Sequence, residues 1–225
     1  MRKTLLLFII VGLSLYNFAQ EIQFETTEHD FGLINYEDPA EFDFVFTNIG
    51  TEPLIVQKPQ STAGVIIRWY PQDPIMPGKK GIIKIAYRTN RTGVLNKRII
   101  IVSNAINSSQ VVLRIKGGVL EKGIKALRKN GFWGVEDNEG KVIIPFEFDE
   151  MKLVYDGLVL KKNGMCGLVT MTNKIVIPFE YEELVLKSSL DDNIYAKKNG
   201  KWGALYKSSG TIKIPFEYET LDEVP

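Results

Sequence analysis

The sequence predicts an all-β protein, with an immunoglobulin-like β-sandwich followed by a meandering domain of three antiparallel β-hairpin repeats. In the first half, short apolar runs alternate with turn-forming residues at the spacing of a sandwich, and no helical period is convincing. In the second half, an Asn-Gly turn recurs at Asn130, Asn163 and Asn199. The intervals of 33 and 36 positions between these turns indicate a repeat architecture.

The composition excludes several classes of protein. The chain has 225 residues, and its 28 Lys and Arg balance 27 Asp and Glu, so we expect no nucleic-acid partner. The single cysteine, Cys166, allows neither an intrachain disulfide nor a thiolate metal cluster. The single histidine, His29, excludes a His-based zinc site and weakens any case for a Ser-His-Asp triad. We therefore expect no cofactor, no metal centre and no catalytic residues.

Residues 1–19 have the layout of a secretory signal peptide. Arg2 and Lys3 begin the segment, residues 5–16 are mainly apolar, and we expect cleavage after Ala19. The apolar run is shorter than the roughly twenty residues of a membrane-spanning helix, so membrane attachment is expected only if this segment stays uncleaved. Export together with one unpaired cysteine fits a bacterial envelope. We expect a periplasmic, extracellular or cell-surface location.

Residues 20–119 are predicted to form the sandwich. Phe42, Phe44 and Phe46 alternate with other residues, including Asp43, and this period of two is typical of a strand packed on one face. Further strands are predicted at residues 22–27, 54–57, 65–70, 82–88, 95–102 and 111–115. Together with residues 41–47, these make seven short strands in about a hundred residues, as in an immunoglobulin-like sandwich.

Three motifs of this segment also carry a family resemblance. They are residues 29–34 (HDFGLI), 44–54 (FVFTNIGTEPL) and 77–81 (PGKKG). In this order they resemble the bacterial branch of the abnormal-spindle/hydin-type Ig-like domains. The resemblance implies a seven-stranded sandwich without an established catalytic role. Bacterial members often carry a Cys-Gly-Cys-Thr run where this chain has residues 61–65, so any role of those cysteines is not expected here.

Two features of the sandwich suggest contacts with a ligand. Trp69 and Tyr70 adjoin Pro71, and aromatic faces with polar tips suit carbohydrate or peptide contacts. The alternative is that both are ordinary core and rim residues of a strand. His29 would need partners to act as a general base, and the sequence identifies none. We expect it to fix the chain ahead of a turn at residues 30–32.

Residues 120–225 contain three copies of one unit, each predicted to form three short strands. The first two strands flank the Asn-Gly turn, because both central residues of a type I′ turn need a positive φ. The third strand runs into an Ile-Pro-Phe-Glu-aromatic segment. We expect Pro145, Pro178 and Pro215 to end the pairing there, since proline has no N–H to donate. The short joint at residues 119–123 predicts a fairly fixed arrangement of the two domains.

A Trp-Gly pair recurs after the Asn-Gly turn, at Trp133 and Trp202. We expect each indole to supply apolar surface, and the following glycine to admit a close ring or strand, or a bulge. Cys166 occupies the tryptophan position of the middle copy and is expected to be a small buried residue. Residues 123–221 resemble the Trp-Gly (KWG) repeat of bacterial proteins. The resemblance implies an exported or surface protein that mediates interactions.

Acidic residues recur in the same units. Glu147, Glu180 and Glu217 each follow a Pro-Phe step, and a second acidic residue comes two positions later in every copy. Three equivalent carboxylates would suit Ca²⁺, and two nearby carboxylates would suit glycoside hydrolysis. The interpretation we favour is a solvated loop that keeps the strand ends soluble.

We therefore expect an exported, non-enzymatic binding protein of the bacterial cell envelope. Its repeat domain would be the contact surface for a protein or a glycan. The candidate contact residues are Trp69, Tyr70, Trp133, Trp202, Glu147, Glu180 and Glu217. Two alternatives stay open. One is a hydrolase of envelope polysaccharide that uses carboxylates roughly 5 to 9.5 Å apart, and the other is a purely structural spacer.

Overall fold

A computed structural model describes residues 19–155, 157–187 and 192–225. Within these ranges the regular elements are β strands, apart from one 3-10 turn at Leu221–Glu223, so the predicted all-β class is confirmed. The predicted signal peptide lies outside the described residues except for Ala19. Across the same ranges there is no helix with the length and hydropathy needed to cross a bilayer.

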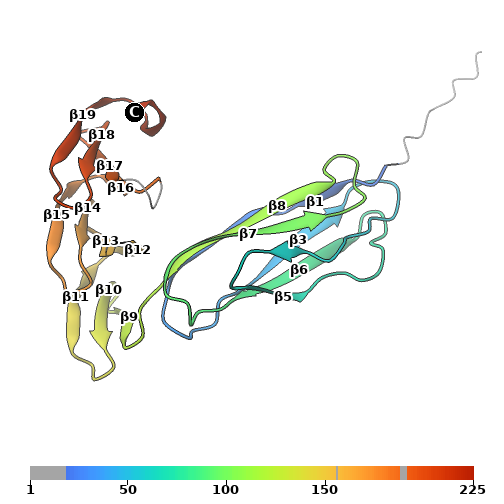
Figure 1. Cartoon of the computed structure of the whole chain (residues 1–225), viewed down its shortest axis with the longest axis horizontal. Helices are drawn as coiled ribbons and strands as arrows, with labels where there is room; N and C mark the ends of the chain where they lie inside the picture. The colour runs from blue at the N-terminus through green and yellow to red at the C-terminus, as the bar shows by residue number, and fades with distance from the viewer. Residues whose placement is uncertain (1–18, 156, 188–191) are drawn as a thin grey trace, which may run out of the picture.

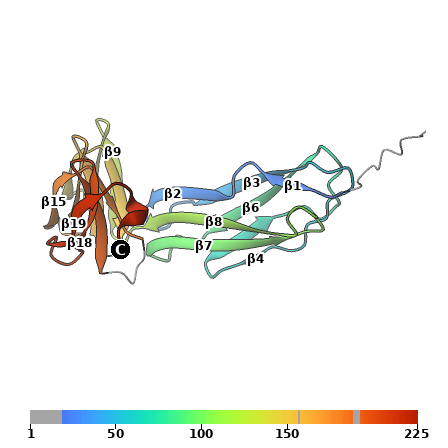
Figure 2. The same cartoon turned by 90° about the horizontal axis from the view of Figure 1, so that it is seen from above.

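The sandwich consists of two four-stranded sheets (Figures 1 and 2). The first contains, in spatial order, β1 (Ile22–Phe24), β3 (Glu41–Asn48), β6 (Lys80–Tyr87) and β5 (Val65–Trp69). The second contains β2 (Glu28–Ile34), β8 (Gln110–Val119), β7 (Gly93–Val102) and β4 (Gln60–Ser61). Neighbouring strands are antiparallel except β2 and β8, which run parallel.

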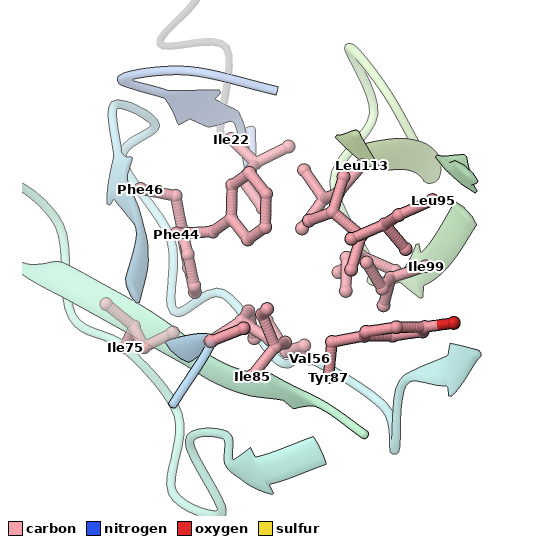
Figure 3. Close-up of a cluster of buried hydrophobic side chains, with 14 of the residues drawn as sticks. Ile22, Phe44, Phe46, Val56, Ile75, Ile85, Tyr87, Leu95, Ile99 and Leu113 are labelled. Atoms are coloured by element: carbon pink, nitrogen blue, oxygen red, sulfur yellow. The ribbon is translucent and has the colours of Figure 1, made fainter. Parts of the chain in front are cut away.

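The core of the sandwich lies between these sheets (Figure 3). Phe44 and Phe46 of β3 are fully buried, as the alternating pattern predicts. Asp43 points to the opposite face and pairs with Lys84 on β6, with 2.5 Å between Oδ2 and Nζ. Aliphatic side chains of the second sheet complete the core, among them Leu95, Ile99 and Leu113. The period of two therefore identifies the buried face of β3 correctly.

Three segments of the sandwich differ from the prediction, and one of them is β4 at Gln60–Ser61, where no strand is predicted. Residues 54–57 do not form a strand, because Leu54 pairs with Ile75 whereas Val56 pairs with Ser103, each as a single bridge. The expected turn at residues 30–32 lies inside β2, a strand that the sequence did not predict. There the Oδ1 atom of Asp30 accepts the N–H of Gly32, whose φ is 65°. Pairing with β8 resumes at Leu33, so the segment is a bulge rather than a turn.

His29 lies on β2 against two aromatic rings. Its ring stacks on Phe42 at a centroid distance of 3.7 Å and meets the edge of Phe31 at 4.5 Å. Burial lowers the pKa of His29 below its ordinary value of 6.5, and the nearby Asp30 opposes this in part. His29 therefore binds a proton more readily in the unfolded chain than in the folded protein. The contribution of neutral His29 to the free energy of unfolding is complete above the ordinary pKa of 6.5. It is lost as the pH falls from there toward the lower pKa that His29 has in the folded protein.

We predict that replacing His29 with Gln flattens the pH dependence of stability between about pH 7 and pH 5. The wild type should lose free energy of unfolding over this range, because protonated His29 is disfavoured among the rings. Urea denaturation at a series of pH values measures the effect. An equally steep loss in His29→Gln would contradict the assignment to this residue.

Three further sheets form the repeat array, and successive units lie one above another in Figure 1. The first sheet contains β9 (Ile124–Lys129), β10 (Phe132–Asp137) and β11 (Val142–Phe148). The second contains β12 (Glu150–Val154), β13 (Gly157–Lys162), β14 (Met165–Val169) and β15 (Ile175–Tyr181). The third contains β16 (Glu183–Val185), β17 (Asn193–Lys198), β18 (Lys201–Tyr206) and β19 (Ile212–Tyr218).

The turns of the hairpins agree with the sequence, and the proline segments do not. In the middle unit Asn163 and Gly164 have φ values of 52° and 80°, as a type I′ turn requires. The prolines do not end the pairing, because β11, β15 and β19 each continue through them. Between the pairs Cys166–Tyr181 and Leu168–Ile177 the ladder slips, so Pro178 lies in a bulge. At a bulge on an edge strand the missing N–H costs no ladder bond.

The sequence also predicted three strands per unit, whereas the second and third sheets have four. The fourth strand is the chain that follows the Pro-Phe segment of the preceding unit. After β11 ends at Phe148, β12 begins at Glu150, and β16 follows β15 in the same way. The first two Pro-Phe segments therefore carry the chain from one sheet into the next.

In every unit the glycine that follows the tryptophan position (Trp133, Cys166 or Trp202) lies beneath the phenylalanine of its own Pro-Phe bulge. A Cβ added to Gly167 would lie 2.9 Å from three atoms of the Phe179 ring, so the ring covers the glycine face-on. The corresponding distance is 2.7 Å between Gly134 and Phe146, and 3.0 Å between Gly203 and the ring of the third unit. The predicted close approach and the predicted bulge therefore both occur, and they are parts of one contact.

Aromatic rings also connect successive units. Phe148, at the end of β11, stacks on Phe179 of the next unit at a centroid distance of 5.5 Å. Tyr181, at the end of β15, contacts Phe216 at 5.7 Å in the same way. Offset ring pairs at such distances are favourable. The Pro-Phe ring of the second and third units therefore contacts both its own glycine and the preceding unit.

We predict that Gly167→Ala lowers the free energy of unfolding by about 1 to 3 kcal/mol, because the new methyl group overpacks against Phe179. In a Phe179→Ala background the same substitution should cost much less. A double-mutant cycle by urea denaturation measures the coupling. Equal costs in the two backgrounds would contradict the proposed contact.

The sandwich and the array meet at a short joint, where β8 runs directly into β9 (Figure 1). Leu120 is fully buried in the core of the first two units. A Cβ on Gly118 would lie 2.5 Å from the side chain of Leu153, so β8 packs closely on β12. The side chain of Asn35 accepts the N–H of Ala126 at 2.8 Å and donates to its carbonyl at 3.3 Å. These contacts fix the array against the end of the sandwich.

Candidate functional site

A groove runs along the seam between the sandwich and the array. It consists of two adjoining hollows of about 630 and 490 Å³ that share lining residues, and we call them together the seam groove. The first hollow, its Trp133 end, is lined by Trp133, Glu150, Lys161, Cys166, Glu183 and Leu184, among others. The second, its Tyr155 end, is lined by Asn96, Lys116, Leu153, Tyr155, Leu186 and Lys187, among others. The size is that of many ligand-binding clefts.

Two edge strands face the Trp133 end. Three consecutive residues of β12, 150–152, line the hollow, and so do all three residues of β16. Successive side chains of a strand point to opposite faces, so a strand with consecutive lining residues presents its edge. Each strand is the outermost one of its sheet, with no strand partner on the outer side among the described residues. Such an edge offers main-chain N–H and C=O groups to an extended segment.

The two ends of the groove differ in charge. Four carboxylates and two lysines line the Trp133 end, namely Asp30, Glu150, Glu182, Glu183, Lys152 and Lys161. At the Tyr155 end, Asp30 faces three lysines, Lys116, Lys152 and Lys187. Part of this charge is already paired. Lys161 lies 3.4 Å from Glu150, Lys197 lies 3.8 Å from Glu183, and Lys116 pairs with Glu28. The groove is therefore acidic beside Cys166 and basic beside Tyr155.

Cys166 is buried at the wall of the Trp133 end. Its Sγ lies 3.6 Å from the carbonyl oxygen of Glu182. Burial raises the pKa of the Cys166 thiol, and the positive charge of Lys161 opposes this only in part. The thiol is therefore protonated at neutral pH, which agrees with the predicted small buried residue rather than a reactive nucleophile.

Among the aromatic residues singled out from the sequence, one reaches the seam groove. Trp133 lines it, whereas Trp202 is buried against Val224 in a separate cluster. Trp69 is 48% exposed at the end of β5, and Tyr70 follows it, half-buried against the sandwich core. Neither lines the groove, so the structure does not bring the four aromatic residues together.

The carboxylates after the Pro-Phe step have lysine partners instead. Glu147 pairs with Lys162 at 2.9 Å, and Glu180 pairs with Lys198 at 3.0 Å, so each pair bridges two units. Glu217, in the last unit, has no ion pair with any residue that the structure describes. The hydrogen bond from Lys198 holds the pKa of Glu180 below its ordinary value. A general acid for glycoside hydrolysis needs the opposite shift.

The acidic residues two positions later have a structural role. The carboxylate of Asp149 accepts the N–H of Asn163 at 3.0 Å, and that of Glu182 accepts the N–H of Gly200 at 3.0 Å. Each therefore satisfies a main-chain donor in the Asn-Gly turn of the following unit. The sequence analysis favours a solvated loop for these residues. In the structure Asp149 and Glu182 instead connect successive units.

The repeated carboxylates would suit a cation only if they lay close together. Across residues 19–155, 157–187 and 192–225, no group of three or more His, Cys, Asp and Glu side chains is arranged to hold a metal ion. The carboxylates belong to successive sheets, and packed sheets are about 10 Å apart.

We predict that Glu182→Ala lowers the free energy of unfolding by about 1 kcal/mol, because it removes the acceptor for the N–H of Gly200. Glu217→Ala is the matched control and should change stability by less than about 0.5 kcal/mol. Thermal or urea unfolding of both variants measures the difference. Equal costs would contradict the role of Glu182 between units.

Several groove residues were missed at the level of sequence. Glu150 and Glu183 lie seventeen positions after Trp133 and Cys166, respectively, and line the same hollow. This common offset within the repeat is the signal that would have found them. Asp30 comes from the bulge of β2, and no local pattern links it to the array.

Two family matches cover most of the described chain. Residues 22–119 match the family named "Protein of unknown function (DUF1573)". Residues 133–164 and 167–202 match the WG containing repeat. The N-terminal half thus carries the DUF1573 match and the C-terminal half the WG-repeat matches. The resemblance to the Trp-Gly repeat is therefore confirmed. No curated protein matches the chain.

Three solved structures illustrate the fold. A protein of unknown function from Porphyromonas gingivalis W83 is 16% identical, with 48% of this chain and 51% of that one covered and a TM-score of 0.40. The chain thus spans about half of that protein. The ASH/PapD-like domain 7 of human CEP192 is 10% identical, with 53% and 99% covered and a TM-score of 0.36. The periplasmic chaperone SfaE is 11% identical, with 68% and 95% covered and a TM-score of 0.33.

Proposed function

We propose that this chain is an exported, non-enzymatic binding protein of the bacterial cell envelope whose seam groove holds an extended segment of a partner protein. The proposal adopts the location that the signal-peptide pattern of residues 1–19 predicts. It also keeps the assignment of the sandwich to the abnormal-spindle/hydin-type domains, which rests on the motifs at residues 29–34, 44–54 and 77–81.

The observation that carries the proposal is the groove beside the edge strand β16, which has no strand partner on its outer side among the described residues, whereas the sandwich covers the edge of β12 at Leu153. An extended peptide can add to such an edge through its main chain, while pockets beside the edge select its side chains. A glycan has no main-chain ladder to offer, so this edge favours a protein partner. The close contact between Gly118 and Leu153 joins the two walls of the groove.

The hydrolase alternative has less support. Glu147 and Glu180 are ion-paired on the strands of the array and do not line the seam groove. The lowered pKa of Glu180 keeps it ionised at neutral pH. A carboxylate in this state cannot donate the proton that the leaving group requires.

We predict that random peptides displayed on phage can be selected for binding to the full-length protein. Reversing two charges in the groove, Glu150→Lys with Glu183→Lys, should weaken the selected peptides by about tenfold or more, because they bind beside these carboxylates. Glu217→Lys, on β19 away from the groove, is the matched control and should bind as the wild type does. Isothermal titration calorimetry with synthetic peptides measures both.

Other outcomes would overturn the proposal. Peptides that bind the double variant undiminished would place the contact elsewhere. Binding of peptidoglycan fragments in place of any peptide would make the partner a glycan. Release of reducing ends from peptidoglycan by the wild type, abolished by Glu180→Gln, would make the protein a hydrolase.

A further inference from the structure

The three units place one residue at the same point of each sheet. In the first and third units it is Trp133 or Trp202, and in the middle unit it is Cys166. In each case the cross-strand neighbour is basic, with the pairs Arg128–Trp133, Lys161–Cys166 and Lys197–Trp202. The first and third units therefore place an indole beside a cation. The middle unit has the cation, Lys161, but no indole.

The geometry of the two complete units shows what this arrangement holds. The guanidinium carbon of Arg128 lies 5.8 Å from the Trp133 ring, and Nζ of Lys197 lies 5.8 Å from the Trp202 ring. Both distances are within the range of cation–π attraction. In the middle unit Lys161 instead points to Glu150 at 3.4 Å, an exposed pair of small stability.

The position of the missing indole lines the Trp133 end of the seam groove. Cys166 and Lys161 both line the Trp133 end, together with Met151 and Leu184. A cysteine side chain is much smaller than an indole, and the hollow of about 630 Å³ opens at this position. The walls combine apolar side chains with a neighbouring cation, as around Trp133 and Trp202.

We infer that the seam groove takes up an aromatic side chain of the partner, which occupies the tryptophan position of the middle unit beside Lys161. This inference rests on the proposed function and names the feature that the groove recognises. An aromatic ring suits the position because it is apolar with a polar tip and attracts a cation to its face. The partner completes in trans what Trp133 and Trp202 complete within the chain.

The charge of the groove adds a second feature of the partner. Four carboxylates and two lysines lie beside Cys166, and the ion pairs of Glu150 with Lys161 and of Glu183 with Lys197 leave Asp30 and Glu182 against Lys152. Basic residues next to the aromatic residue of the partner would lie near Asp30 and Glu182. The recognised segment is therefore an extended, basic peptide with one aromatic side chain.

The experiment uses N-acetyl-L-tryptophanamide as the probe and N-acetyl-L-leucinamide as its matched control. We expect the tryptophan amide, titrated into the full-length protein, to shift the NMR signals of Lys161, Leu184 and the Trp133 indole. A single side chain should bind with a dissociation constant on the order of millimolar. The leucine amide should leave these signals nearly unchanged.

A filling substitution of Cys166 decides the inference. Cys166→Trp fills the hollow from within, so it should weaken the tryptophan amide by about tenfold or more. Glu217→Lys, on β19 away from the groove, is the control and should bind the amide as the wild type does. Thermal unfolding of Cys166→Trp shows whether the variant is folded, and Cys166→Phe replaces it if it is not.

Undiminished binding of the tryptophan amide to the folded filling variant would overturn the inference, as would equal shifts with the leucine amide. The proposed function can survive such a result. The proposed function is supported alone if the selected peptides lack an aromatic residue and bind Cys166→Trp as tightly as the wild type. The same peptides must then bind the Glu150→Lys, Glu183→Lys variant more weakly. If neither the peptides nor the amides bind, both proposals fall.

Discussion

The array depends on one contact that each unit repeats, a phenylalanine ring packed on the glycine that follows Trp133, Cys166 or Trp202. The ring of Phe179 can approach Gly167 so closely only because the glycine has no Cβ. The same contact accounts for the bulge that contains Pro178, since the ladder must slip for the ring to turn back onto its own sheet. It also leads the chain out of one sheet and into β16 of the next.

The seam groove follows from this way of stacking. Because the first two Pro-Phe segments carry the chain into a new sheet, β12 and β16 begin their sheets as edge strands. The sandwich covers β12 at Gly118 and Leu153, and the next edge along, β16, stays open beside the hollow. The stacking of the sheets thus leaves the edge strand β16 beside the hollow, and this strand edge forms the candidate binding surface.

Sequence reasoning succeeded where a feature depends on adjacent residues. The Asn163-Gly164 turn, the alternation around Phe44 and the close approach at Gly167 all follow from local chemistry. It failed where two distant segments decide the outcome. Pro178 lies within a strand because the ring of Phe179 packs on Gly167 of β14. Residues 54–57 form no strand because Leu54 bridges to Ile75 and Val56 bridges to Ser103. Asp30 and Glu183 line the same groove although they lie far apart in the sequence, and no local pattern predicts this.

The most direct measurement of the central contact is the proton chemical shift of the three glycines, Gly134, Gly167 and Gly203. A proton held over the face of an aromatic ring is shielded by the ring current. The contact therefore predicts an Hα signal displaced well upfield of the random-coil position for each of these residues, and for Gly167 a return toward that position in Phe179→Leu. Three random-coil shifts in the folded protein would contradict the account.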